Sequence, residues 1–400
     1  MKAIKAIWER VRSEQVYLLW LGFLCVILAI GGYASGVRFL GHEEVMGATN
    51  LIPLGILIST YVFFVVTSTG LCFVTSFGHV FGFRRFESIA RRGVFLSIIT
   101  LLVGFFAIGV ETERPWRLGS LFLTSPNFTA PIWWMAFFYT LYLVCLVVEL
   151  CGLLFHKMVL ARYAGLFGFL TAIAAHSTLG AIFGLIKAKS FWEGPYLPIY
   201  FILSALVSGT AFLILMTVAT YWVERRPIPA ETRALLVHMG KKLLVLFLGI
   251  VIFFWTWKVI TSLYGHPPEK YEAMMSLLAG PQSVNFWLFE VAIGILIPFF
   301  FLLLHPAARS IGGVFIASLL VLAGLFVSRF DLVVGGQIAP VWGGPYASYS
   351  PSGIEWIFVL TSMALCLLIY SLGERLLPLE EGDSHCGANQ TAETDTGRAS

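Results

Sequence analysis

Residues 285–304 read NFWLFEVAIGILIPFFFLLL, and Glu290 is the one ionisable side chain among them. A helix needs about 20 predominantly apolar residues to cross the hydrocarbon core of a bilayer, so this stretch has the length and composition of a transmembrane helix. A carboxylate inside hydrocarbon is costly and marks a functional candidate. The stretch therefore predicts a membrane-spanning helical protein. It also indicates that ionisable residues in other apolar stretches are candidates for function.

Ten stretches of the chain have this character, and they predict an all-α, polytopic membrane protein with about ten transmembrane helices. The composition agrees, since 58% of the residues are hydrophobic and 12% are charged, against about a quarter charged in soluble domains. The predicted spans are residues 17–37, 51–76, 94–110, 131–155, 163–186, 197–222, 242–264, 285–304, 311–329 and 354–373.

The ten helices form a predicted transmembrane domain at residues 17–373. Within it we expect two four-helix bundles plus flanking helices, with the first bundle at about 51–186 and the second at about 197–329. The first apolar stretch follows a basic start, as a secretory signal does, but it is long and lacks a clean small-residue cleavage site. We therefore expect this stretch to be retained as a helix.

The basic residues predict the orientation. An even number of helices places both termini on one side, and most of the 26 Lys and Arg residues fall at helix ends on that side. Cytoplasmic loops carry such an excess. We therefore expect a multi-pass protein of the bacterial cytoplasmic (inner) membrane, with a cytoplasmic N-terminus at 1–16 and a disordered cytoplasmic tail at 374–400.

Two loops on the opposite side are long and rich in Pro, Gly and aromatic residues. Residues 111–130 read ETERPWRLGSLFLTSPNFTA, and residues 335–353 read GGQIAPVWGGPYASYSPSG. This composition favours ordered loops. They either form a docking surface for a partner or merely cap the bundle, and the sequence leaves both interpretations open.

Four ionisable side chains lie within predicted spans and are the candidates for proton transfer during catalysis: Glu149, His176, Lys258 and Glu290. His176 is near the middle of its span. A histidine at that depth can hydrogen-bond a quinone carbonyl and accept a proton when quinol is oxidised, and a nearby carboxylate or tyrosine can pass the proton on. The alternative is that His176 only joins two helices by a hydrogen bond.

A further group of charged residues is expected in the second bundle. By depth, Lys258, Glu290, Asp331 and Glu355 could meet in its outer half. Ionisable residues inside a membrane usually pair with one another or mark a proton pathway. The group is therefore either a structural ion-pair cluster or a route for protons.

The histidine and cysteine positions bear on cofactors. A b-type haem in a membrane bundle usually needs two axial histidines within the spans, and only His176 is deep. An iron–sulfur cluster usually needs four thiolates at close spacing, and the six cysteines lack that spacing. We therefore expect no haem, no iron–sulfur cluster and no metal site in this chain, and redox centres in a partner.

Six short motifs occur in order along the chain. They are ETERPWR (Glu111–Arg117), SPNF (Ser125–Phe128), HSTLG (His176–Gly180), FWLFE (Phe286–Glu290), SRF (Ser328–Phe330) and YSPSGIE (Tyr349–Glu355). Over roughly residues 50–373, this ordered set resembles the NrfD/PsrC-type membrane subunits (polysulfide reductase NrfD family). It is most similar to the ten-helix branch, which includes subunits of hydrogenase-2-type, Dsr, Hmc/Tmc and alternative-complex-III-type complexes.

The resemblance implies a haem-free subunit that exchanges electrons between the quinone pool (menaquinone or ubiquinone) and an iron–sulfur or cytochrome partner on the periplasmic face. The implied partners are a periplasmic ferredoxin-like iron–sulfur subunit and a catalytic or cytochrome c subunit. Glu111, which stands where the family usually has aspartate, and Arg114 would form a polar rim facing them. Coupling to proton movement is left open.

The resemblance also implies a quinone pocket in the first bundle. In eight-helix members, a histidine near the start of that bundle helps to bind quinone. This chain has no histidine there, and Tyr61 occupies a similar place. Trp134, Tyr139 and His176 complete the expected pocket.

Two rival functions fit the same helices, a secondary transporter and a purely structural membrane anchor. Transporters often show matched helices interrupted by Gly or Pro, and the sequence shows no matched pair. The net charge of +4 is small and calls for no nucleic-acid partner. The terminal substrate and the direction of electron flow are not determined by these patterns.

Overall fold

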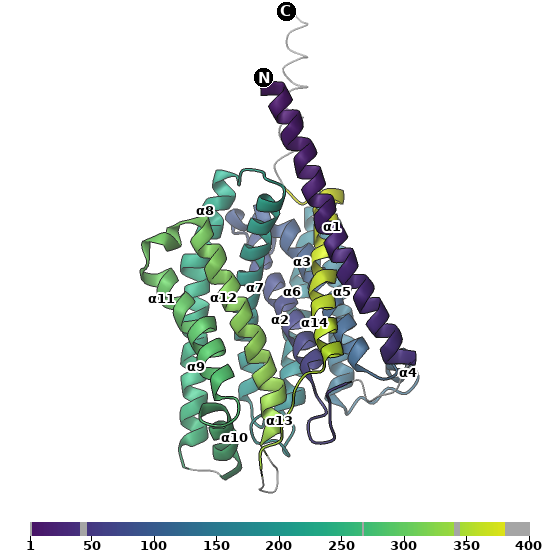
Figure 1. Ribbon diagram of the computed structural model, residues 1–400, viewed down its shortest axis with the longest axis vertical. Helices are drawn as coiled ribbons and strands as arrows, with labels where there is room; N and C mark the ends of the chain where they lie inside the picture. The colour runs from purple at the N-terminus through teal and green to yellow at the C-terminus, as the bar shows by residue number, and fades with distance from the viewer. Residues whose placement is uncertain (1, 41–45, 266–267, 340–344, 381–400) are drawn as a thin grey trace, which may run out of the picture.

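The computed structural model describes residues 2–40, 46–265, 268–339 and 345–380 (Figure 1). Within these ranges the chain forms helices and loops and no strand. Ten helical segments of the same ranges are long and apolar enough to cross a membrane. The predicted all-α, polytopic architecture with ten spans is therefore confirmed.

Several spans combine more than one helical element. In chain order the elements are α1 (Lys2–Leu40), α2 (Ile56–His79), η2 (Arg84–Phe86), α3 (Glu87–Glu111), α4 (Trp116–Leu123), α5 (Pro131–Leu154), α6 (Met158–Gly184), α7 (Tyr196–Val223), α8 (Ala230–His238), η3 (Met239–Leu244), α9 (Val245–Leu263), α10 (Pro268–Leu278), η4 (Asn285–Leu296), α11 (Ile297–Leu304), η5 (Pro306–Arg309), α12 (Ile311–Phe330), η6 (Asp331–Gly335), α13 (Gly336–Ile338) and α14 (Gly353–Leu376). The segments η3, η4 and η6 are π-helical.

The helices pack around α2 and α7. Helix α2 contacts α3 and α6, and α5 packs against the same two helices. On its other side α7 contacts α9 and α12, and α12 contacts η4 and α11. The long helix α1 lies along α14, which in turn packs against α3 (Figure 1).

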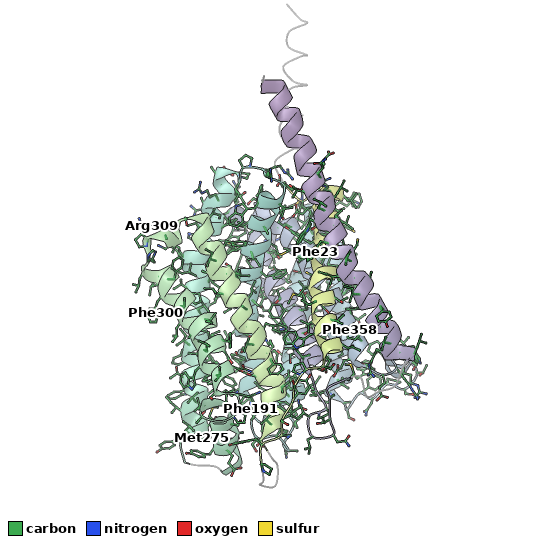
Figure 2. All side chains as sticks on the ribbon, viewed as in Figure 1. Phe23, Phe191, Met275, Phe300, Arg309 and Phe358 are labelled. Carbon is green, nitrogen blue, oxygen red and sulfur yellow. The ribbon has the colours of Figure 1, made fainter. Side chains whose placement is uncertain are left out.

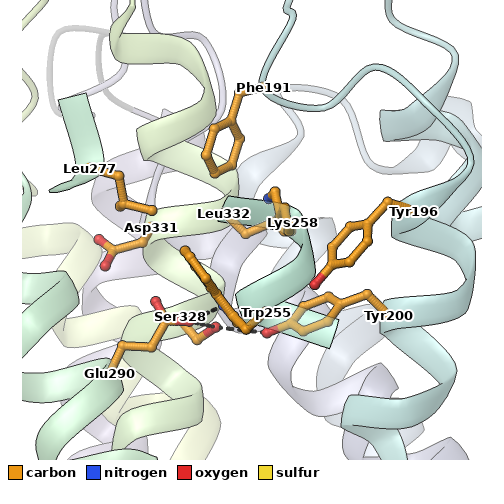
Figure 3. Close-up of a pocket in the computed structure, with 10 residues that line it drawn as sticks. All are labelled: Phe191, Tyr196, Tyr200, Trp255, Lys258, Leu277, Glu290, Ser328, Asp331 and Leu332. Carbon is orange, nitrogen blue, oxygen red and sulfur yellow. Dashed lines mark hydrogen bonds between the residues drawn. The ribbon is translucent and has the colours of Figure 1, made fainter. Parts of the chain in front are cut away.

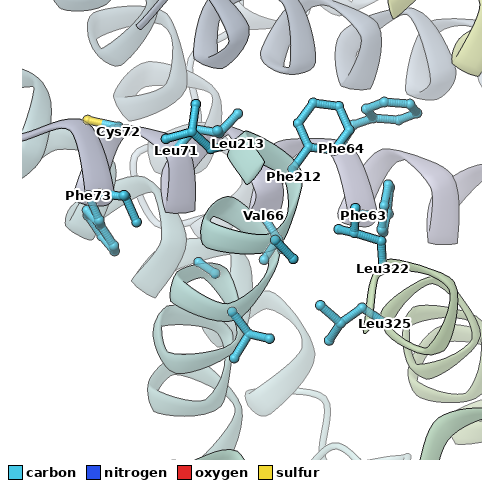
Figure 4. Packing of buried hydrophobic residues seen from close by; sticks show 14 of the residues in the cluster. Phe63, Phe64, Val66, Leu71, Cys72, Phe73, Phe212, Leu213, Leu322 and Leu325 are labelled. Atoms are coloured by element: carbon cyan, nitrogen blue, oxygen red, sulfur yellow. The ribbon is translucent and has the colours of Figure 1, made fainter. Parts of the chain in front are cut away.

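The centre of the molecule is an apolar contact between α2, α7 and α12 (Figure 4). Phe63 and Phe64 of α2, Phe212 of α7 and Leu322 of α12 are buried in it. In the most apolar part of each span, 94% of α2 is buried within the protein and 17% of α1. Helix α2 is therefore enclosed by protein, whereas α1 mostly faces its surroundings.

The outer surface of the bundle is rich in large apolar side chains, among them Phe23 of α1 and Phe300 of α11 (Figure 2). Such a surface is expected where lipid is the solvent. Because lipid tails are as apolar as these side chains, close packing and interhelical hydrogen bonds hold membrane helices together. The polar contacts inside the bundle therefore fix how its helices sit against one another.

An ion pair ties α14 to α3 at the end of the bundle where α1 begins. Arg92 Nε and Nη2 donate to the Glu374 carboxylate at 2.5 and 3.0 Å, and Nη2 reaches Glu380 Oε1 at 3.3 Å. We expected a disordered tail from residue 374. That prediction is wrong for residues 374–380, because α14 continues to Leu376 and these pairs hold the chain beyond it. The rest of the predicted tail lies outside the described residues.

At the opposite end, hydrogen bonds fasten the loops to the start of α2. Gln337 Nε2 donates to Leu54 O at 2.9 Å, and Ile56 N donates to Tyr349 Oη at 3.0 Å. Lys189 Nζ donates to Gln337 O at 2.8 Å. Burial lowers the pKa of Lys189 and raises the pKa of Tyr349. The described parts of residues 335–353 therefore cap the bundle at this end. A role of this loop in docking a partner stays a prediction.

Candidate functional site

His176 on α6 is enclosed in a small polar group contributed by three helices. Its Nδ1 lies 3.0 Å from Thr69 Oγ1 of α2 and 3.1 Å from Tyr139 Oη of α5. All three side chains are buried. The other ring nitrogen, Nε2, is buried and has no hydrogen-bond partner among the described residues. One nitrogen of a deeply placed imidazole is thus left for a further partner.

The two hydroxyls can serve either tautomer of His176. When Nδ1 carries no proton, it accepts a hydrogen bond from Thr69 or Tyr139, and when Nδ1 is protonated, it donates to one of those oxygens. In the first case the neutral ring presents Nε2–H as a donor, and in the second it presents Nε2 as an acceptor. The arrangement suits an imidazole that receives a proton on one nitrogen and releases it from the other.

A second polar group lies further along α2 and α5, towards the end where α1 begins. His79 Nε2 is 2.7 Å from Glu149 Oε1, and both side chains are enclosed. Two turns earlier on α5, Tyr142 Oη donates to Ser68 O of α2 at 3.0 Å. The predicted span ended at residue 76, before His79, but α2 continues to this histidine and carries it into the bundle.

A small cavity, with room for about one water molecule, lies on the other side of α7 (Figure 3). Its lining consists of Phe191, Tyr196, Tyr200, Trp255, Lys258, Leu277, Glu290, Ser328, Asp331 and Leu332. Glu290 Oε1 accepts hydrogen bonds from Ser328 Oγ at 2.8 Å and from Trp255 Nε1 at 3.1 Å. Lys258 Nζ lies 4.0 Å from the centroid of the Phe191 ring, a position in which the ring face attracts the cation.

Three of the four residues expected together in the outer half of the second bundle line this cavity, and Glu355 does not. Its Oε1 accepts from Tyr349 Oη at 3.0 Å and its Oε2 from Ser352 N at 2.7 Å. This carboxylate forms a capping box at the start of α14. The prediction for Glu355 is therefore wrong, because a Glu three residues after a Ser satisfies its own helix terminus.

Both carboxylates of the cavity lie in π-helical turns. Glu290 belongs to η4, and Asp331 begins η6. Such turns occur frequently at functional sites. Within the described residues, no donor meets either carboxylate oxygen of Asp331 with hydrogen-bonding geometry. The cavity therefore holds one buried carboxylate that accepts two hydrogen bonds, Glu290, and one that accepts none among the described residues, Asp331, together with the Lys258 ammonium.

Arg329 lies between the cavity and the His176 group. Its guanidinium stands 5.6 Å from the Tyr200 ring centroid and 5.2 Å from that of Phe201. The Phe201 ring also packs edge-on against His176, with ring centroids 6.3 Å apart. The predicted span ended at Arg329, whereas the helical span of the structure runs on to Ile338. The SRF motif was the signal that could have drawn attention to it.

Sequence comparison decides the family. The family model described as "Polysulphide reductase, NrfD" matches residues 44–341, about three-quarters of the chain. The chain belongs to this family. The match includes α2 to α13, and with them the His176 group, the pair of His79 and Glu149, the cavity and Arg329. Helices α1 and α14 lie outside it.

Relatives of this NrfD-family chain match it over most of their length. It is 24% identical to a selenate reductase subunit of Mesobacillus selenatarsenatis, over 92% of this chain and 94% of that protein. It is 24% identical to the Hdr-like menaquinol oxidoreductase integral membrane subunit of Archaeoglobus fulgidus, over 93% and 96%. It is 22% identical to the menaquinone reductase integral membrane subunit of Nitratidesulfovibrio vulgaris, over 92% and 93%.

In this NrfD-family chain, Tyr139 and His176 of the expected pocket meet, and Trp134 points elsewhere. Tyr61 is buried, with Oη 3.6 Å from Sδ of Met135, one helical turn before Tyr139. Trp134 is 39% exposed, and its Nε1 donates to a carbonyl of the outer loop at 2.9 Å. Trp134 lies five positions before Tyr139, so its side chain projects from a different side of α5.

The two residues of the expected polar rim differ in burial. Glu111 ends α3, with one carboxylate oxygen buried, and its backbone oxygen accepts from Arg38 Nη2 at 3.4 Å. Arg114 is exposed in the turn before α4. The ion pairs found among the described residues do not include Arg114. Its guanidinium is therefore exposed at the end of the bundle opposite the start of α1.

Proton transfer is the chemistry that these side chains support. Imidazole, carboxylate, phenol and ammonium groups are the usual acids and bases of proton relays inside membranes. In the part of the chain that the structure describes, no three His, Cys, Asp or Glu side chains gather in a way that could hold a metal ion. The hydrogen bonds and charges of these side chains therefore determine what the site can do.

Proposed function

We propose that this chain is the quinone-reactive membrane subunit of a respiratory oxidoreductase complex. The observation that carries the proposal is the enclosed imidazole of His176, whose Nδ1 meets two hydroxyls while Nε2 has no partner among the described residues. Interconversion of quinol and quinone moves two electrons and two protons. A buried base with a route for its proton is what such a reaction requires of the protein.

His176 would act directly on the substrate through Nε2. In quinol oxidation Nε2 would accept one of the two hydroxyl protons, and Nδ1 would give a proton to the oxygen of Tyr139 or Thr69, which would release its own hydroxyl proton in turn. The second quinol proton would leave to another acceptor, such as water. In quinone reduction the same groups run in reverse, with Nε2–H donating to a carbonyl oxygen. Tyr61, near Tyr139 on the neighbouring helix, would bound the ring of the substrate. The electrons leave to redox centres in a partner subunit.

The names of the relatives support quinone as the substrate. The Archaeoglobus relative is named a menaquinol oxidoreductase subunit, and the Nitratidesulfovibrio relative is named a menaquinone reductase subunit. These two names also describe opposite directions of electron flow. A menaquinone-type substrate is therefore the first to test, in both directions.

The partner is proposed to bind at the outer, periplasmic face, as an iron–sulfur or cytochrome subunit. His176 lies eight residues before Gly184, the last residue of α6, which corresponds to a rise of about 12 Å along the helix. The exposed Arg114 and the ordered loops lie at that same end. In this orientation both termini are in the cytoplasm and the protein is in the bacterial inner membrane.

Two further groups are candidates for proton movement coupled to this reaction. The pair of His79 and Glu149 would exchange protons with the cytoplasmic side. Lys258 and Glu290 line the cavity nearer the outer face. Their enclosed positions support a proton route better than a lipid-facing position would, because ionisable groups in membrane spans turn towards the interior or to water.

The proposal is tested with His176→Ala and His176→Gln in the complex purified with its native partners. We expect both variants to assemble normally and to lose most oxidation and reduction of a short-chain menaquinol analogue. The matched control is His305→Asn, at an exposed histidine after α11. Unchanged turnover in the His176 variants would contradict the proposal and favour a structural anchor. Solute flux into vesicles containing this chain alone would instead favour a transporter.

A further inference from the structure

A crevice opens between α1, α7 and α14 at the end of the bundle where α1 begins. It consists of two adjoining hollows that open to the surface. Tyr17, Val223, Glu224 and Glu374 line both of them. The crevice is separate from the His176 group and from the cavity beside Glu290, so its role does not depend on the proposed function.

The deeper hollow has an apolar floor. Met216 and Ala219 of α7 and Leu367 of α14 line it, and Trp20 of α1 lies at its side. Trp20 Nε1 donates to Ser371 Oγ at 3.2 Å. Tryptophan with its polar edge engaged in this way is enriched at the boundary between hydrocarbon and headgroups. The floor therefore lies at the depth reached by the acyl chains of a lipid.

The shallower hollow carries charges of both signs. They are Glu14, Glu224, Arg226, Glu374 and Arg375. Some of these charges already have partners within the protein, since Glu374 is paired with Arg92 and Glu224 with Arg226. These two pairs leave the hollow with one further acid and one further base.

Glu14 and Arg375 are those remaining charges. Neither has an ion-pair partner among the residues that the structure describes. The Arg375 guanidinium is held 3.5 Å from the centroid of the Tyr17 ring, and Tyr17 Oη is fixed by a 2.9 Å hydrogen bond to Ser371 O. The crevice thus presents a positioned cation and an anion at the mouth of an apolar slot.

The crevice also lies where the family core meets additional helices. The family match begins at residue 44 and ends at 341, so α7 belongs to it, whereas α1 and α14 do not. Most of α1 is exposed on the surface of the protein. The slot therefore lies beside a helix that mostly faces the surroundings of the protein.

We propose that this crevice binds one phospholipid with a zwitterionic, phosphoethanolamine-type headgroup. One acyl chain lies along Met216, Ala219 and Leu367. The phosphate lies at Arg375 and the ammonium at Glu14, which matches one remaining cation and one remaining anion. The bound lipid joins α1 and α14 to α7 at the membrane surface.

The test uses the full chain purified in mild detergent and examined by native mass spectrometry after incubation with palmitoyl-oleoyl phosphatidylethanolamine or phosphatidylglycerol. We expect one retained phosphatidylethanolamine per chain. Arg375→Gln should lower this retention at least tenfold, and Glu14→Gln should shift the preference towards phosphatidylglycerol. Arg309→Gln is the matched control, because Arg309 is an exposed basic residue away from the crevice (Figure 2).

A second measurement covers the case in which a variant folds poorly. Thermal unfolding of delipidated protein should move to higher temperature on addition of phosphatidylethanolamine, and Arg375→Gln should abolish that shift while Arg309→Gln retains it. Equal retention by the two arginine variants would overturn the proposal. So would preferential retention of phosphatidylglycerol by the unaltered chain, which would indicate an anionic-lipid site, or retention of detergent only.

Discussion

Arg329 Nη2 donates a hydrogen bond to Ser204 Oγ over 2.6 Å and so joins α12 to α7 inside the bundle. The arginine is 1% exposed. Its guanidinium lies near the ring of Tyr200, which lines the cavity with Glu290, and near the ring of Phe201, which contacts His176. A single buried guanidinium therefore connects the two polar regions of the protein.

Removal of the Arg329 charge should destabilise the protein. Arg329→Met removes one of the two positive charges near the enclosed Glu290 carboxylate, the other being Lys258, and also breaks the hydrogen bond to Ser204. Loss of the whole partner of a buried charge costs about 3–5 kcal/mol, so we expect a smaller loss here. We expect a lower thermal unfolding temperature in detergent. Glu290→Gln in the same chain should restore part of the loss, because the carboxylate that Arg329 helps to stabilise is then absent while Lys258 remains.

The four proteins of this double-mutant cycle measure the coupling between the two sites directly. Arg309→Met provides the control for loss of an exposed arginine and should leave the unfolding temperature unchanged. Strictly additive effects of the Arg329 and Glu290 substitutions would show that the two charges do not interact.

The two hydroxyls on Nδ1 of His176 should be partly interchangeable. Tyr139→Phe or Thr69→Val removes one of them and leaves the other at hydrogen-bonding distance. We expect each single variant to lower menaquinol-analogue turnover less than about tenfold, and the double variant to lower it by about 10²–10⁴, the usual contribution of general acid–base catalysis. Turnover is measured in the purified complex.

The control for the hydroxyl series is Thr171→Val. It removes a hydroxyl from α6, the helix of His176, where that hydroxyl donates to backbone oxygens of its own helix. Its turnover should equal that of the unaltered protein. If the Tyr139 and Thr69 double variant were no slower than the slower single variant, the two hydroxyls would not be interchangeable partners of His176 Nδ1.

The spans were predictable because the bilayer imposes their length and apolarity on the sequence. Residues 285–304 were expected as one helix, and the structure has a span with the same limits, Asn285–Leu304. Hydropathy carries no information on which helix faces are neighbours. The meeting of Tyr139 with His176 was expected, whereas the third member, Thr69 of α2, was not.

The errors at span ends have a common cause. Arg329 and Asp331 lie close together in sequence, and this polar stretch was interpreted as the end of a helix. Each is instead accommodated inside, Arg329 by Ser204 and two aromatic rings and Asp331 in the cavity. His79 likewise lies beyond the predicted end of its span and is enclosed because Glu149 faces it. Only the three-dimensional packing reveals such partners.

The pair of His79 and Glu149 should affect proton movement more than electron transfer. Glu149→Gln keeps a hydrogen-bonding group beside His79 but removes the ionisable carboxylate. In proteoliposomes of the complex, we expect quinol turnover within about twofold of normal under uncoupled conditions, since the acid–base work at the substrate is done elsewhere. The number of protons taken up per electron should fall, as measured with an entrapped pH-sensitive dye.

Val147→Ala is the control for this experiment, because Val147 lies on the same helix and is exposed on its outer side. It should change neither turnover nor proton uptake. An unchanged ratio of protons to electrons in Glu149→Gln would leave the pair with a purely structural role.

Gly70 and Gly209 set the distance between α2 and α7. A Cβ on Gly209 would collide with the backbone of Gly70 and Leu71, and a Cβ on Gly70 would collide with the backbone of Ala205. Small residues at such crossings let membrane helices approach closely. We expect Gly70→Ala and Gly209→Ala each to lower the free energy of unfolding by about 1–3 kcal/mol, the usual cost of overpacking.

Gly109→Ala separates this effect from helix propensity, because nothing lies within 4 Å of a Cβ at that position. It should be neutral or stabilising by up to about 1 kcal/mol, since alanine favours helix more than glycine does. The double variant of Gly70 and Gly209 should be less destabilised than the sum of the single variants, because both act on one contact.

Thr69 adjoins Gly70, so a displaced α2 should also move the Thr69 hydroxyl away from His176 and lower turnover. Equal unfolding temperatures for Gly70→Ala and Gly109→Ala would mean that this crossing tolerates a wider spacing.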